Sequence, residues 1–126
     1  MSFDWAQYVN VARELVGEKT SPSSEEAKAR AAISRAYYAA FNKARWYLRY
    51  KDYDRNIPQD GAAHEYIKTR FRTHPDAQYK TVGTTLNQLS IERKKADYND
   101  NFPNAADQAK SSIKAAATII SILDSL

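Results

Sequence analysis

The sequence predicts an all-α protein, an up-and-down antiparallel four-helix bundle with one short extra helix, folded as a single domain over residues 1–126. Three observations support this fold class. Glycine and proline are scarce, at three and four residues, whereas a β-rich fold of this length needs many turn residues. Alanine is abundant, leucine, lysine, glutamate and arginine make up much of the rest, and all five favour helices. Apolar residues recur at three- and four-residue spacings between the helix breakers.

The first predicted helix covers residues 3–16, where the apolar side chains fall on one face. Ser2 precedes this helix as its N-cap, and Gly17 ends it. A linker follows over residues 18–24 and separates the first helix from the second.

The second predicted helix is the longest, over residues 25–50, because neither glycine nor proline interrupts it. A capping box made by Ser23 and Glu26 starts it. Its apolar residues form one continuous stripe, and small alanines flank the stripe, so we expect this helix to lie centrally in the bundle. The stripe consists of Ile33, Ala36, Tyr37, Ala40, Phe41, Ala44 and Leu48.

The rest of the chain predicts three more helices, over residues 62–73, 78–97 and 105–123. Residues 51–61, which contain Pro58 and Gly61, and residues 98–104 are predicted loops, and Pro75 ends the first of the three helices. Gly83 weakens the middle helix of the three, and Asn104 is placed to cap the last one.

A polar row lies opposite the apolar stripe of the second helix. Charge is concentrated there as well, since residues 28–55 hold eight basic residues against two acidic ones, and residues 1–27 are net acidic. Two interpretations stay open: a solvated face neutralised by the acidic segment, or a groove in which arginine and tyrosine bind phosphate and base. The row consists of Arg35, Tyr38, Asn42 and Arg49.

Arg93 continues an apolar stripe near the end of the helix over residues 78–97. A charged residue in such a position needs a partner or must face a cleft. Asp97 lies one turn further on, beside Tyr98, although Arg35 and Arg30 are alternative partners for this carboxylate. The pair either locks the helix end or holds an arginine as a clamp for phosphate.

Two motifs and a histidine follow one another along the chain: Arg30-Ala-Ala-Ile-Ser-Arg-Ala-Tyr-Tyr-Ala-Ala-Phe41, then His64, then Arg93-Lys-Lys-Ala-Asp-Tyr98. Together they closely resemble the HEPN (higher eukaryotes and prokaryotes nucleotide-binding) domain family. The resemblance extends over roughly residues 3–125. It implies an up-and-down helical bundle that is often dimeric and associates with nucleotides or RNA. It also implies a place in bacterial or archaeal defence or toxin–antitoxin systems, beside a minimal nucleotidyltransferase partner.

The chain departs from the RNA-cleaving members of that family. In those members an arginine is followed, after four to six residues, by a histidine, and no metal is used. The corresponding positions after Arg93 are Tyr98, Asn99 and Asp100. We therefore expect a nucleotide-, RNA- or partner-binding module rather than an enzyme. Two alternatives remain: a metal-independent RNA endonuclease using Arg93, Tyr98 and His64, or a structural, antitoxin-like interaction protein.

Composition narrows the remaining possibilities. The absence of cysteine excludes disulfides and thiolate metal sites, and His64 and His74 are the only histidines, so we expect no metal and no cofactor. The sequence contains neither a secretory signal nor an apolar run long enough to span a membrane, which predicts a soluble cytoplasmic protein that binds no membrane. The expected partners are RNA or a nucleotide, a nucleotidyltransferase-type protein, and a second copy in a homodimer whose cleft is lined by Arg93, Asp97 and Tyr98.

Overall fold

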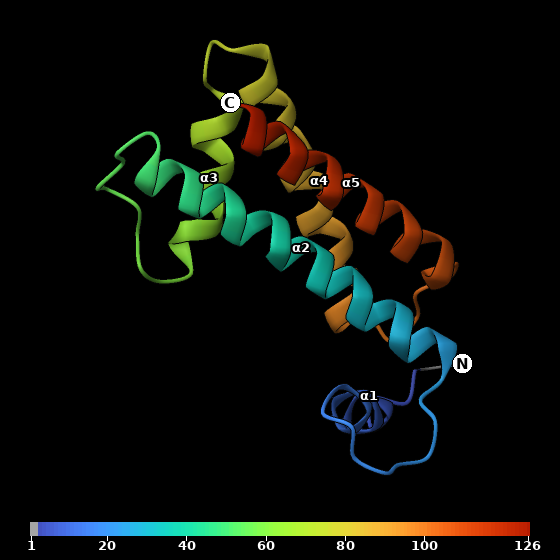
Figure 1. Cartoon of the computed structure of the whole chain (residues 1–126). Coiled ribbons are helices and arrows are strands. Elements are labelled where there is room, and N and C mark those ends of the chain that lie inside the picture. The colour runs from blue at the N-terminus through green and yellow to red at the C-terminus, as the bar shows by residue number, and fades with distance from the viewer. Residues whose placement is uncertain (1–2) are drawn as a thin grey trace.

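The computed structural model describes residues 3–126, and in these residues it contains α-helices and no β-strand. The all-α prediction is confirmed, and the predicted bounds of the long second helix agree with those observed. Figure 1 shows the elements in order. They are α1 (Gln7–Leu15), α2 (Glu25–Tyr50), α3 (Ala62–Arg72), α4 (Ala77–Tyr98) and α5 (Ala105–Ser125).

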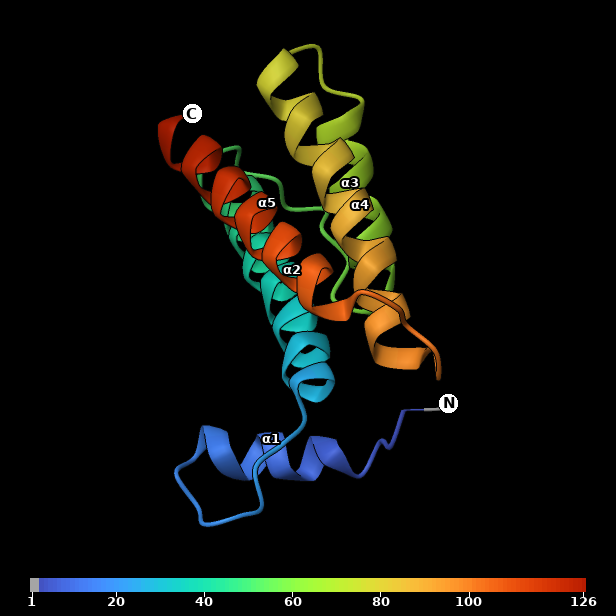
Figure 2. The same ribbon diagram turned by 90° about the vertical axis from the view of Figure 1, so that its right-hand side faces the viewer.

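The bundle is built from α2, α3, α4 and α5, while α1 lies crosswise at one end (Figures 1 and 2). The short helix outside the bundle is thus α1, whereas the helix predicted over residues 62–73 belongs to the bundle as α3. Helices α3, α4 and α5 alternate in direction, but α2 and α3 run the same way because the loop between them crosses back along α2 (Figure 2). This return brings the start of α3 beside the middle of α2.

The start of α1 differs from its prediction. The helix begins at Gln7, four residues later than expected, after a turn in which the Asp4 carboxylate accepts a hydrogen bond from Ala6 N (3.1 Å). Ser2, the predicted cap, lies outside the described residues. Gly17 follows the helix with a φ of 78°, the left-handed conformation that favours glycine at a helix end.

The predicted capping box at the start of α2 is wrong. Ser24 is the N-cap, and its Oγ accepts a hydrogen bond from Ala27 N (3.1 Å). Ser23 instead donates through its backbone N (2.7 Å) and its Oγ (2.9 Å) to the carboxylate of Glu14. Ser23 therefore fastens the linker to α1, and Glu26 is free to approach Arg30 (3.6 Å).

The start of α5 is at Ala105 as predicted, but Asn104 makes no side-chain capping bond. Its backbone is left-handed (φ 59°), a conformation that asparagine tolerates better than most residues, so Asn104 turns the chain into the helix. Helix α4 begins one residue before the predicted start, where the Asp76 carboxylate accepts hydrogen bonds from Gln78 N and Tyr79 N.

The predicted apolar stripe of α2 forms the centre of the core. All seven of its side chains are buried, and Phe41 is 4% exposed. All of them except Ile33 pack against one apolar face from each of the other bundle helices. These faces consist of Ile67 and Phe71 on α3, Val82, Leu86 and Leu89 on α4, and Ala116, Ile119 and Leu123 on α5. Ile33 packs in a smaller cluster with Ala96, Phe102, Ala105 and Ala109.

A second, smaller assembly holds the N-terminal segment to the bundle. The guanidinium of Arg30 is fully buried, and its Cζ lies 4.3, 4.9 and 5.6 Å from the ring centroids of Phe3, Trp5 and Phe102. Its Nη1 donates a hydrogen bond to the carbonyl oxygen of Ala96 at the end of α4 (2.8 Å). We call these five residues the Arg30 clamp. Arg30 is therefore not the partner of Asp97.

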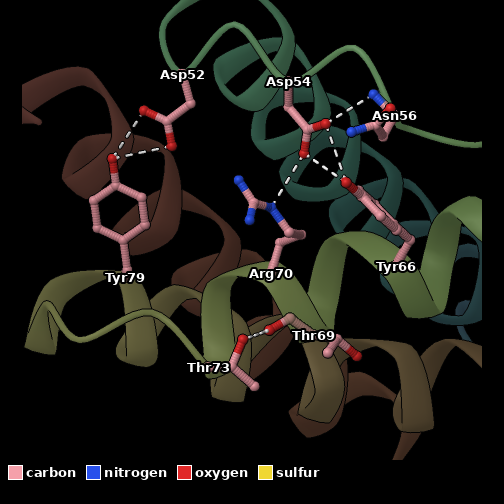
Figure 3. A network of polar contacts seen from close by, with 8 residues as sticks. All are labelled: Asp52, Asp54, Asn56, Tyr66, Thr69, Arg70, Thr73 and Tyr79. Carbon is pink, nitrogen blue, oxygen red and sulfur yellow. Dashed lines mark hydrogen bonds and ion pairs between the residues drawn. The ribbon is translucent and has the colours of Figure 1, made fainter.

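The loop between α2 and α3 is fixed by a polar network (Figure 3). Asp54 is buried and accepts hydrogen bonds from Tyr66 Oη (2.8 Å), while Arg70 Nε lies 3.1 Å from the same carboxylate. Tyr79 Oη of α4 donates to Asp52 (3.2 Å). These contacts hold the returning loop against α3 and so set where α3 starts along α2.

Gly83 is required by packing, because α4 approaches the end of α3 closely at this residue. A Cβ on Gly83 would lie 2.5 Å from the backbone N of Arg72 and 2.9 Å from its Cα. Gly83→Ala gains about 1 kcal/mol of helix propensity, but the overpacking should leave the protein destabilised by about 1–3 kcal/mol. Urea denaturation measures this change. Thr84→Ala, on the exposed neighbour, is the control and should not destabilise, whereas a more stable Gly83→Ala would contradict the packing argument.

Candidate nucleic-acid interface

Arg93 and Asp97 form the ion pair that the i,i+4 spacing predicts. Arg93 Nη1 lies 3.3 Å from Asp97 Oδ2, and the Arg93 side chain is 11% exposed. Ser34 Oγ donates to the same Oδ2 (3.4 Å). Of the three candidate partners for Asp97, the structure selects Arg93, since Arg30 lies in the clamp and Arg35 is exposed.

The guanidinium of Arg93 also contacts two aromatic rings of α2. Its Cζ lies 5.4 Å from the centroid of Tyr37 and 5.6 Å from that of Tyr38, which is 38% exposed. Its Nε is buried and has no hydrogen-bond partner within residues 3–126. The guanidinium of Arg93 is thus held in one position by a carboxylate and two rings, with one buried N–H that has no partner in the described residues.

His64 joins this site although it is distant in sequence. Its Nδ1 lies 2.6 Å from Tyr37 Oη, and its ring stacks on Phe41 at a centroid distance of 4.3 Å. Burial lowers the pKa of His64, and the positive charges of Arg93 and three further basic side chains lower it more. Burial raises the pKa of Tyr37 to about 12. His64 and Arg93 therefore both contact Tyr37, and the imidazole is neutral at neutral pH.

Tyr98, the third candidate catalytic residue, is not drawn into this site. It is the last residue of α4 and is 72% exposed. No hydrogen bond joins it to Arg93 or His64 in the part of the chain that the structure describes.

The exposed face of α2 contains the predicted polar row together with additional basic and aromatic side chains. The row residues are exposed, and three further exposed side chains extend it at helical spacing. Trp46 and Tyr50 are 44% and 55% exposed, and their rings are 5.7 Å apart. Sequence reasoning missed these two, although a helical projection places them beside Arg49. We call this surface the α2 stripe; it consists of Arg35, Tyr38, Asn42, Arg45, Trp46, Arg49 and Tyr50.

Beyond the end of α2 the stripe continues into a pocket of about 420 Å³, lined among others by Arg49, Tyr50, Tyr53 and Arg55. Tyr53 is 76% exposed and has a φ of 54°. A bulky residue in the left-handed region is uncommon and costs conformational energy. The loop thus presents a tyrosine ring to solvent beside two arginines.

At the other end of the stripe a pocket of about 360 Å³ separates α1 from α2. Its walls are largely apolar, and Tyr38 and Asp97 bring it to the edge of the Arg93 ion pair. The pocket exists because the Arg30 clamp holds the segment before α1 against the bundle. Its apolar walls include Val11, Leu15 and Ala31.

Residues 3–126 bring together no group of three or more histidine, aspartate or glutamate side chains that could hold a metal ion. In the same residues no helix has the length and hydrophobicity needed to cross a membrane. The chain matches no protein-family model, no curated protein and no solved structure. The HEPN resemblance therefore rests on the quoted motifs, and membership of that family stays a prediction.

The lowered pKa of His64 predicts a pH-dependent stability. The unfolded histidine takes up a proton below about pH 6.5, whereas the folded one takes it up only at a lower pH. The free energy of unfolding should therefore fall as the pH drops from about 7.5 to about 5.5. His64→Phe keeps the stacking on Phe41 and removes the titrating group, so its stability should change less over this range. Urea denaturation at several pH values tests this, and equal slopes in both proteins would contradict it.

Proposed function

We propose that this protein is a non-catalytic module that binds single-stranded RNA along the α2 stripe. The observation that carries the proposal is the stripe itself, in which exposed arginines alternate with exposed aromatic rings on one helix. Aromatic side chains stack on bases, and arginines pair with phosphates, so this arrangement suits an unpaired strand. The concentration of basic residues between positions 28 and 55 gives this surface a positive electrostatic potential that attracts the phosphates of RNA.

At the Tyr38 end of the α2 stripe, Arg93 adds a rigidly held guanidinium to the proposed binding surface. Asp97 and the two tyrosine rings hold the guanidinium in one orientation, so little side-chain entropy is lost when a phosphate binds. Tyr38 belongs to both the stripe and the Arg93 site, which lets a base stack beside the phosphate that Arg93 contacts.

The HEPN resemblance supports the same function and adds a biological setting. We propose a role in a bacterial or archaeal defence or toxin–antitoxin system, with a nucleotidyltransferase-type protein as a partner. Failure of the protein to bind RNA would favour the structural, antitoxin-like alternative, in which the same face binds protein.

One observation favours RNA cleavage as the second candidate function. His64 and Arg93 both contact Tyr37, so the chain holds an arginine and a neutral histidine close together without the usual sequence motif. A neutral imidazole accepts a proton, and an arginine stabilises a phosphate as charge develops. Metal-free incubation of labelled RNA with wild type, Arg93→Ala and His64→Ala tests this candidate. Cleavage that is lost in both variants would establish it and overturn the non-catalytic proposal.

Binding to the α2 stripe predicts a specific pattern of losses. Arg35→Ala and Arg49→Ala should each weaken binding of a short single-stranded RNA and flatten its salt dependence, by about one counterion per lost phosphate contact. Fluorescence anisotropy across a salt series measures both quantities. Lys110→Ala and Lys114→Ala remove the same charge from exposed positions of α5 and serve as controls. Equal losses in both sets would show that net charge, and not the stripe, determines binding.

The predicted homodimer is tested by light scattering over a concentration series. A second copy placed on the Arg93 end would bring two arginines together, and an anionic ligand between them would relieve their repulsion. We expect a mass of twice 14.3 kDa at micromolar concentrations. A monomer mass up to high micromolar concentration would contradict the dimer and its shared cleft.

A further inference from the structure

The Asp97 carboxylate has unused hydrogen-bonding capacity beside the pocket between α1 and α2. Both of its bonds, from Arg93 Nη1 and from Ser34 Oγ, go to Oδ2. Within residues 3–126, no hydrogen bond reaches Oδ1. A carboxylate accepts at about four lone-pair sites, so Oδ1 is open to a donor that enters the pocket.

The other walls of this pocket suit a flat ring. Tyr38 offers an aromatic ring and Ala31 an apolar surface from α2, while Val11 supplies apolar surface from α1. The volume of about 360 Å³ falls in the range of roughly 300–1,000 Å³ common for small-molecule sites. Arg35 at the wall carries the positive charge that the sugar-linked phosphate of a nucleotide would need.

We propose that this pocket binds a guanine base, with Asp97 accepting hydrogen bonds from its Watson–Crick edge and Tyr38 contacting its ring. This inference rests on the proposed RNA-binding function and gives the site its base specificity. Guanine is the common base that presents two adjacent donors on that edge, its ring N1–H and its exocyclic amino group. Adenine and cytosine each place an acceptor beside their amino group, and uracil flanks its single N–H with two carbonyls, so each sets an acceptor against the carboxylate.

The direct test compares short oligouridines that differ in one central nucleotide, with anisotropy as the readout. A central guanosine should tighten binding by about tenfold or more over uridine, as expected for hydrogen bonds to a charged acceptor. Inosine, which lacks the exocyclic amino group, should fall between the two, and adenosine and cytidine should give little gain. Equal binding of all oligomers would overturn the guanine pocket while leaving RNA binding by the stripe intact. Failure of every oligomer to bind would overturn both.

Two variants separate recognition in the pocket from a general effect on the fold. Ala12 lines the pocket and is exposed, so Ala12→Trp should fill the space and remove the guanosine preference while retaining oligouridine binding. Ala117→Trp places the same ring on an exposed position of α5 and should keep the preference. Retention of the guanosine preference in Ala12→Trp would overturn the assignment.

Asp97→Asn gives a change of specificity that a structural role alone would not produce. The asparagine amide still accepts from the ring N–H, but its NH₂ group now faces the exocyclic position and donates there. Xanthosine carries a carbonyl at that position, so the variant should prefer a central xanthosine to a central guanosine, the reverse of wild type. An unchanged preference for guanosine would contradict direct contact.

A competition experiment shows whether the pocket binds a free guanine nucleotide or a guanosine within RNA. Free guanosine monophosphate and the guanosine-containing oligomer present the same ring to the pocket. Competition by the mononucleotide at similar concentrations would assign the pocket to free guanine nucleotides, whereas competition by the oligomer alone assigns it to guanosine within RNA. Competition by neither would overturn the site.

Discussion

The architecture depends on the fully buried guanidinium of Arg30. A buried charge is tolerated when its hydrogen bonds and its surroundings compensate for lost hydration. Here the carbonyl oxygens of Ala96 and Asp100 accept from it at 2.8 and 3.4 Å, at the negative end of the α4 dipole. The rings of Phe3, Trp5 and Phe102 contribute cation–π contacts. The Arg30 side chain thus joins the N-terminal segment, α2 and the end of α4. It thereby fixes the position of α1 beside α2, which forms the pocket, and the position of the last turn of α4, which contains Asp97.

Helix α2 performs two tasks because its two sides differ in chemistry. The inward side is apolar and packs on three other helices, which leaves it rigid. The outward side is basic and aromatic over several turns. Tyr37 lies at the border, fully buried yet hydrogen-bonded to His64 and close to Arg93. Side chains on a rigid helix keep their spacing better than side chains on a loop, which favours recognition of a repeating polymer.

Local rules predicted those features that depend on neighbouring residues. The bounds and buried stripe of α2 follow from periodicity, and the Arg93–Asp97 pair follows from its i,i+4 spacing. The position of His64 did not follow, because it depends on a loop that crosses back and is fixed by Asp54. The placement of α1 depends on contacts between Phe3 and Arg30 and between Trp5 and Asp100, which no local pattern reveals. Gly83 looked like a weakness of its helix and is instead a point of close approach between helices.

The crosswise helix α1 has a thermodynamic consequence for any ligand of the α1–α2 pocket. Within the described residues its backbone packs closely on α2 alone among the helices. Its link to α4 is a hydrogen bond from Tyr8 Oη to the carbonyl oxygen of Ala96 (3.4 Å), so few contacts are lost when α1 undocks, and the four-helix core stays in place. Only molecules with α1 docked offer the complete pocket, and the apparent dissociation constant therefore equals the intrinsic constant divided by the docked fraction. By the same linkage, a bound ligand shifts the population towards the docked state and protects the amides of α1 from hydrogen exchange. Affinity at this site is thus set partly by residues of the Arg30 clamp that never touch the ligand.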